Sequence, residues 1–191
     1  MRKSNNHKKK VICIIPARGG SKGIKKKNIV DCGGKPLIYW SIQTGLELVK
    51  NKSIDRCIVS SDCDEIINVA KNYNADVPFK REKKIADDKS KAIEYVLDAI
   101  KRLKLANETY ESILILQPTC PIRNINDVSE AIKLFTQSDS NSLISCYQEE
   151  YITNSVIYYA CKNKLQPISK SHNKGINRQD HKPMMIRNGS I

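Results

Sequence analysis

The chain has 191 residues, 40% of them hydrophobic, and carries a net charge of +13 at pH 7. This length allows one domain with a substantial core and is short for two, and no apolar run approaches the ~20 residues that span a bilayer. The apolar stretch at residues 11–15 is also too short for the core of a signal peptide, so we expect a cytoplasmic protein.

The positive charge is concentrated near the N-terminus. Residues 1–35 contain eleven Lys and Arg against a single acid, and so account for +10 of the net charge. Residues 1–10 lack an apolar face to bury and are predicted to form a basic flexible tail. The seven cysteines are scattered with no C-x-x-C pair, which argues against a zinc site or a disulfide framework.

Short apolar runs alternate with amphipathic segments along the first three quarters of the chain. Runs rich in β-branched residues predict strands at 11–15, 56–60, 113–116 and 142–147. Such an alternation of strands and helices predicts an α/β fold with a mostly parallel sheet. Ligands of these sheets bind beyond the carboxyl ends of the strands, so the segments that follow the strands are the candidate binding segments.

The helices are predicted from apolar residues that recur three and four positions apart. The first is expected to start near Pro36, and the last to have Asn126 as its N-cap. The third is expected to bury one side made of Ile93, Val96, Leu97, Ile100 and Leu103. Asp62 either caps the second helix or has a functional role, and both readings stay open.

The loop after the first strand, IPARGGSKGIKKKNI at residues 15–29, is the most informative segment. Its glycines allow close backbone approach, and its free N–H groups and cations are suited to a polyphosphate. It matches neither the P-loop nor the dinucleotide fingerprint. Lys25 and Lys26 are expected to be solvated rather than catalytic. From the residues alone, a solvated basic loop remains the alternative to a phosphate site.

Five segments, in order, resemble the N-acylneuraminate cytidylyltransferase family, which includes enzymes for sialic, legionaminic and pseudaminic acids. They are the loop just described, VSSD (59–62), REKKIADD (81–88), LQPTCPIR (116–123) and NRQDHKPMMIRNGSI (177–191). The resemblance implies a Rossmann-like three-layer sandwich of the nucleotidyltransferase type. It also implies one domain over residues 11–191, with residues 148–183 as a small dimerisation arm or an insertion, and a homodimer.

The resemblance further implies a reaction: CMP is transferred from CTP to the anomeric hydroxyl of a nonulosonic acid, pyrophosphate leaves, and Mg²⁺ is the cofactor. By motif position, the residues expected to bind CTP are Arg18, Ser21, Lys22, Lys27, Asn28, Arg81 and Asp88. Those expected to contact the sugar are Gln117, Thr119, Arg178 and Asn188, although Thr119 could simply shape its turn. Arg18, Lys27 and Gln117 are expected to be catalytic.

Members of this family continue past the segment matching Ile191, into a strand and an Asp-x-Asp motif that binds the metal. No metal ligand is therefore assigned here, and a truncated form that binds CTP without turnover is the first alternative. A cytidylyltransferase for the sugar acid Kdo is less favoured, because Lys22 stands where that group keeps an arginine. A nucleic-acid binder is disfavoured by the 6% aromatic content and by the lack of a basic stripe outside the loop and tail. No membrane partner is expected, and the sequence does not select one nonulosonic acid.

Overall fold

The computed structural model describes residues 9–20, 23–87, 90–149, 152–153, 156–162, 164–170 and 182–189. It divides into two compact units, Met1–Leu143 with Ser190–Ile191, and Ile144–Gly189. Most of the predicted tail lies outside the described residues, and Lys9 and Lys10 are exposed. Within the described residues, no helix combines the length and the apolar character needed to cross a membrane.

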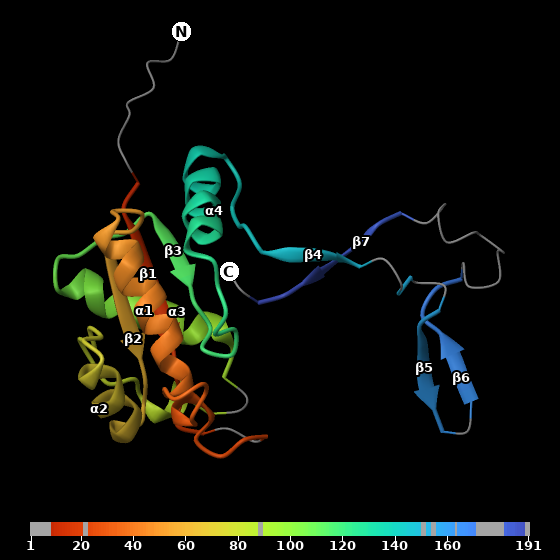
Figure 1. Cartoon of the computed structure of the whole chain (residues 1–191), viewed down its shortest axis with the longest axis horizontal. Coiled ribbons are helices and arrows are strands. Elements are labelled where there is room, and N and C mark those ends of the chain that lie inside the picture. The colour runs from red at the N-terminus through yellow and green to blue at the C-terminus, as the bar shows by residue number, and fades with distance from the viewer. Residues whose placement is uncertain are drawn as a thin grey trace, which may run out of the picture. The chain divides into compact units, whose positions relative to one another are not determined.

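The first unit is built on a parallel sheet that has three strands in the described part of the chain, in the order β2-β1-β3 (Figure 1). The strands are β1 (Val11–Pro16), β2 (Arg56–Ser60) and β3 (Ser112–Ile115). In the central strand, Ile12 pairs with Arg56 on one side and with Ile113 on the other. Residues 11–15 are all buried, as expected for a strand covered on both faces.

Helices cover both faces of this sheet. On one face, Cys13 and Ile15 belong to a core with residues of α1 (Leu37–Lys50), α2 (Asp64–Asn72) and α4 (Ile125–Gln137). On the other face, Ile12 and Ile14 pack against α3 (Ala92–Leu105). Because side chains alternate in direction along β1, this strand contributes residues to two separate cores. The α/β class, the parallel sheet and the three-layer arrangement are confirmed.

The third helix buries Val96 and Leu103 as predicted, but the prediction is wrong for Ile93 and Leu97. Tyr95, Val96, Ala99 and Leu103 of α3 turn inward, whereas Ile93 is 54% exposed and Leu97 is 60% exposed. The sequence offered two overlapping apolar stripes. The structure selects the one that brings small Ala99 against the sheet, where a helix can approach closely.

The boundaries of several elements also differ from the predictions. Helix α4 begins two residues earlier than predicted because Asn124, not Asn126, is its N-cap, and the Asn124 side chain accepts the Asn126 N–H at 2.9 Å. Helix α2 has Cys63 as its N-cap, so Asp62 does not cap it. The strand predicted at 142–147 is observed as β4 (Cys146–Glu149).

The second unit consists of two antiparallel ribbons. Strand β4 pairs with β7 (Met184–Arg187), and β5 (Tyr158–Cys161) pairs with β6 (Lys164–Pro167). None of the described residues of this unit is buried. The predicted arm, residues 148–183, falls inside it. Two-stranded ribbons are marginally stable by themselves, so burial against another surface would stabilise this unit.

Gly45 marks a close approach of α1 to the sheet. A Cβ at this position would lie 2.2 Å from Cys57 Sγ and 3.2 Å from Cys57 Cβ. Alanine usually stabilises a helix by about 1 kcal/mol relative to glycine, but overpacking costs about 1–3 kcal/mol. We expect Gly45→Ala to lower the midpoint of thermal unfolding. The double variant Gly45→Ala/Cys57→Ala should lose less stability than the two single variants added together, and strict additivity would contradict this contact.

Candidate functional site

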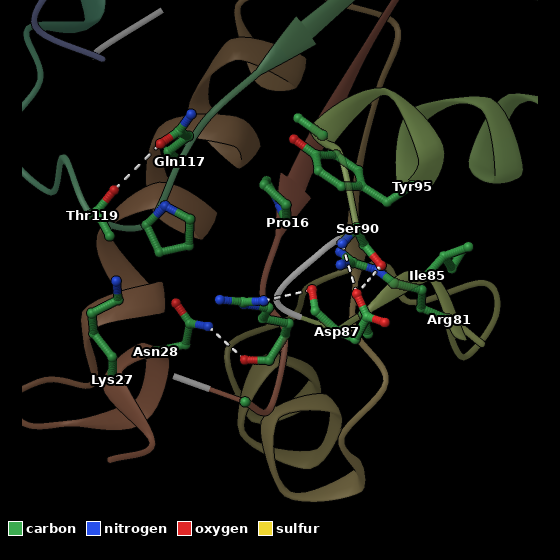
Figure 2. A pocket seen from close by; sticks show the side chains of 15 residues that line it. Pro16, Lys27, Asn28, Arg81, Ile85, Asp87, Ser90, Tyr95, Gln117 and Thr119 are labelled. Carbon is green, nitrogen blue, oxygen red and sulfur yellow. Dashed lines mark hydrogen bonds between the residues drawn. The ribbon is translucent and has the colours of Figure 1, made fainter. Parts of the chain in front are cut away.

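A cleft of about 330 Å³ opens beyond the carboxyl ends of β1 and β3 (Figure 2). Strand β1 lies in the middle of the order β2-β1-β3. After β1 the chain first forms β2 on one side of it, and later forms β3 on the other side. The crevice between β1 and β3 is therefore the switch point at which open α/β sheets bind ligands. The lining comes from the loop after β1, the segment 81–95 and the turn after β3: Pro16, Arg18, Gly20, Lys27, Asn28, Arg81, Ile85, Ala86, Asp87, Ser90, Ala92, Tyr95, Gln117, Pro118 and Thr119.

Asp62 holds the loop after β1 in place. Its Oδ1 accepts the N–H of Gly19 at 2.9 Å. A Cβ on Gly19 would lie 2.8 Å from Cys63 Cβ, so this position requires a glycine. Asp62 therefore shapes the loop and does not cap α2, so the capping reading is wrong and a functional role stays a prediction.

The lysine run is divided by the short 3₁₀ helix η1 (Lys27–Ile29). Lys26 precedes it with a left-handed φ of 52°, and its Nζ lies 2.7 Å from Glu65 Oε2 on α2. Lys25 is exposed. Of these three consecutive lysines, Lys27 alone lines the cleft. Asn28 is buried and donates from Nδ2 to the Arg18 carbonyl at 2.9 Å, which closes the loop on itself.

Arg18 joins this loop to the segment before α3. Its Nη1 donates to the Asp87 carbonyl at 2.7 Å. The Asp87 carboxylate in turn accepts the N–H and the hydroxyl of Ser90 at 2.7 and 2.8 Å. Figure 2 shows Asp87 and Ser90 side by side in the pocket, joined by these bonds. A ligand bound here would meet the Arg18 guanidinium next to the Asp87 carbonyl.

Arg81 is a buried cation, with 4% of its surface exposed. Its Nε donates to Ser60 Oγ at 3.0 Å and its Nη2 to the Ser60 carbonyl at 2.5 Å. The guanidinium carbon lies 4.7 Å from the centroid of the Tyr95 ring. Burial lowers the pKa of the Arg81 guanidinium, and the negative charge of Asp62 acts in the opposite direction. An arginine remains charged in such a setting because its reference pKa is far above neutral.

Arg123 fixes the turn after β3. Its Nη2 donates to the Gln117 carbonyl at 2.6 Å and its Nη1 to the Ser41 hydroxyl of α1 at 3.0 Å. The Thr119 hydroxyl lies 3.5 Å from Gln117 Oε1. Burial lowers the pKa of the Arg123 guanidinium. This arginine fixes the Gln117 backbone to α1 without lining the cleft itself.

Six of the predicted site residues come together around this cleft: Arg18, Lys27, Asn28, Arg81, Gln117 and Thr119. Four others lie outside the described residues: Ser21, Lys22, Asp88 and Arg178. Asn188 belongs to the second unit, where its Oδ1 accepts the Ser145 hydroxyl at 2.5 Å. The roles assigned to all of these residues stay predictions.

Three residues that shape the site were missed by sequence reasoning. Tyr95 lies in the third predicted helix but outside its predicted buried side, and Asp87 and Arg123 lie in the motifs at 81–88 and 116–123 without an assigned role. No local signal distinguishes Tyr95, because an aromatic residue at helical spacing usually belongs to a core.

The described residues do not form a site for the expected Mg²⁺. Within that part of the chain, no three His, Cys, Asp or Glu side chains come together in a way that could hold a metal ion. The carboxylates of Asp62 and Asp87 accept bonds from Gly19 and Ser90 and act within the loops. No step proposed below passes through a metal.

Comparison with known proteins gives consistent matches. The family model described as "Cytidylyltransferase" matches residues 12–187. The pseudaminic acid cytidylyltransferase of Campylobacter jejuni (strain 81-176) is 39% identical over 166 residues, which cover 86% of this chain and 70% of that protein. The N-acylneuraminate cytidylyltransferase of Escherichia coli O18:K1:H7 is 35% identical over 126 residues, or 66% of this chain and 28% of that protein.

Among solved structures, the chain is similar to a CMP:2-keto-3-deoxy-manno-octonic acid synthetase that was solved in complex with CTP. The TM-score is 0.66 at 15% sequence identity, over 94% of this chain and 72% of that one. At this level of identity the likeness concerns the fold. It agrees with the Rossmann-like nucleotidyltransferase architecture described above.

Proposed function

The chain belongs to the cytidylyltransferase family, and we propose that it transfers CMP from CTP to the anomeric hydroxyl of a nonulosonic acid, releasing pyrophosphate. The observation that carries this proposal is the gathering of Arg18, Lys27, Arg81 and Gln117 around one cleft at the switch point of the sheet. Pseudaminic acid is the first candidate sugar, because a relative named for that activity is 39% identical over most of this chain.

The triphosphate would lie against the loop after β1. In the proposed reaction the sugar hydroxyl attacks the α-phosphorus and gives its proton to a surrounding water molecule, and the bond from the α-phosphorus to the bridging oxygen breaks. Negative charge then builds up on the leaving pyrophosphate. Nucleotidyl transfer depends mainly on positioning and on neutralising this charge. Arg18 and Lys27 are the cations of this loop that line the cleft, and we assign both to that task.

The base would lie on the opposite side of the cleft. Figure 2 shows Arg81, Ile85 and Ser90 across from Lys27 and Thr119. A guanidinium has five N–H donors, and within the described residues two of those of Arg81 have acceptors, both on Ser60. Cytosine presents two adjacent acceptors, O2 and N3, whereas uracil carries a hydrogen on N3. Arg81 would therefore favour CTP over UTP.

The sugar would approach the turn after β3. Gln117 and Thr119 line the cleft there, and Arg123 holds the Gln117 backbone. We also assign Ser21, Lys22 and Asn28 to the nucleotide loop, Asp88 to the base side, and Arg178 and Asn188 to the sugar. Mg²⁺ would accompany CTP, held by phosphates and water. All seven cysteines are free thiols, which supports a reducing, cytoplasmic setting.

The direct test is pyrophosphate release from CTP and Mg²⁺ with a panel of nonulosonic acids. We expect turnover with pseudaminic acid above its legionaminic and sialic counterparts, and at least tenfold less with UTP in place of CTP. CTP binding without pyrophosphate release for every sugar would contradict the transfer and favour a non-catalytic CTP-binding protein. Turnover with Kdo alone would overturn the assignment of the sugar.

We further propose that the protein is a homodimer in which the second unit meets a second copy of the chain. This unit has no buried residue in its described part, yet it exposes large apolar side chains: Tyr147, Val156, Tyr158, Tyr159, Leu165, Ile168 and Met185. Apolar surface of this extent on a thin ribbon favours association.

Light scattering after size exclusion should therefore give twice the chain mass at micromolar concentration. The double variant Tyr159→Ser/Leu165→Ser should shift the mass toward the monomer, because it removes apolar area from both strands of the β5–β6 ribbon. Leu105→Ser changes an equally exposed leucine on the first unit and is the control. A monomeric mass for the unmodified chain would contradict the proposal.

A further inference from the structure

Arg81 is fixed from two directions. Strand β2 holds the edge of the guanidinium, because Ser60 accepts from Nε through its hydroxyl and from Nη2 through its carbonyl. Helix α3 holds the face, because the Tyr95 ring centroid lies 4.7 Å from the guanidinium carbon. Two hydrogen bonds along one edge leave a planar group free to tilt about that edge. The ring removes this freedom, because a cation over an aromatic face is attracted to it.

The rest of the guanidinium is left for a ligand. Its remaining N–H groups have no hydrogen-bond acceptor within the described residues, although Arg81 is only 4% exposed. A buried donor without an acceptor is costly. Both Arg81 and Tyr95 line the cleft, so a bound molecule there can supply the acceptor. The tilt of the guanidinium decides where these donors point.

Tyr95 has features that fit this role. It is 9% exposed and packs in the same core as Ile12 and Ile14, so its ring cannot easily move away. Its hydroxyl has no hydrogen-bond partner within the described residues. Burial raises the pKa of Tyr95, so the ring stays neutral and keeps its cation-attracting face. The contact with Arg81 therefore depends on the ring and does not require the hydroxyl.

We propose that Tyr95 is a positioning residue of the nucleotide site, whose ring sets the tilt at which Arg81 meets the two adjacent acceptors of cytosine. This inference rests on the proposed use of CTP. It predicts that changes at Tyr95 alter the choice between CTP and UTP and the KM for CTP, and leave kcat at saturating CTP nearly unchanged. If Tyr95 contributed only to the packing of the core, replacing it would weaken the binding of CTP and of UTP to the same extent.

The test is calorimetric titration of CTP and of UTP into the full chain and its variants. Tyr95→Phe keeps the ring and should bind CTP within about twofold of the unmodified chain. Tyr95→Met keeps the bulk of the side chain without the ring. It should weaken the binding of CTP about tenfold and the binding of UTP about twofold or less. In an Arg81→Met background, Tyr95→Met should cause no further loss, because Tyr95 acts through Arg81.

A second series keeps the side-chain shape, in case Tyr95→Met does not fold. Phe, 4-fluoro-Phe and 3,4,5-trifluoro-Phe at position 95 weaken the cation-attracting face stepwise, so the preference for CTP should decline in the same order.

The outcomes separate this inference from the proposed function. If the unmodified chain shows no preference for CTP, both fail. If the unmodified chain prefers CTP and Tyr95→Met or the fluorinated series leaves that preference unchanged, the positioning role alone is overturned. A large loss in Tyr95→Phe would also overturn it, because the hydroxyl would then be the contact.

Discussion

Replacing Lys27 with methionine is expected to lower kcat/KM for CTP by about 100- to 1,000-fold, the usual cost of removing one group that stabilises developing charge. Lys27 is the member of the lysine run that lines the cleft, beside Asn28, whose amide holds the loop. Methionine keeps most of the length of the side chain, so the loop should keep its shape. The measurement is the initial rate of pyrophosphate release against CTP concentration.

Lys25→Met is the matched control for this experiment. Lys25 lies two residues away in the same loop, carries the same charge, is exposed and does not line the cleft. The two variants have the same net charge, so a nonspecific electrostatic effect would lower both rates equally. We expect Lys25→Met to stay within about threefold of the unmodified chain, as is usual for exposed lysines. Equal losses would contradict a specific role for Lys27.

Replacing Arg81 with methionine is expected to weaken CTP binding about 100-fold, because two hydrogen bonds from a charged donor are lost. The preference for CTP over UTP should fall with it. The fold should persist, since the Ser60 carbonyl still accepts the Ala17 N–H at 2.9 Å. Titration of both nucleotides measures the binding, and thermal unfolding checks that the variant is folded.

Arg102→Met provides the comparison for Arg81. Arg102 also stacks on an aromatic ring, at 5.4 Å from the Phe79 centroid, and its Nε lies 3.0 Å from Asp98. It does not line the cleft. Arg102→Met should therefore lower the stability of the fold and leave the affinity for CTP unchanged. If Arg102→Met weakened CTP as much as Arg81→Met, the assignment of Arg81 to the base would be wrong.

Much of the fold follows from local patterns. The strand at 56–60 was predicted with its observed bounds, and the first helix follows Pro36 as expected. The positions of these elements follow from the short-range periodicity of apolar residues, which can be read from neighbouring positions in the sequence. Which side of α3 faces the sheet was beyond that information: Ile93 is exposed although it is apolar, whereas Ala99 is buried with Ile12 and Ile14.

The candidate site was predictable where a motif carries it. The loop with Arg18 and Lys27 stands directly after a buried strand, and the turn with Gln117 follows another. The rule that ligands meet the carboxyl ends of parallel strands was enough to place both at one edge of the sheet. The motif resemblance supplied the roles, which remain predictions for the experiments above.

Local sequence patterns were therefore sufficient for the α/β class, for the chain order of the elements in the first unit and for the loops that carry the chemistry. The side-chain contacts that support these loops became visible only in the packed fold: Asp62 accepts the Gly19 N–H, Arg123 joins the Gln117 carbonyl to Ser41 of α1, and Tyr95 packs against Arg81. Each of these contacts brings together segments that are far apart in the sequence. The strand order β2-β1-β3 and the packing of α3 on one face bring them within reach, and that arrangement depends on how whole elements bury their surfaces against each other.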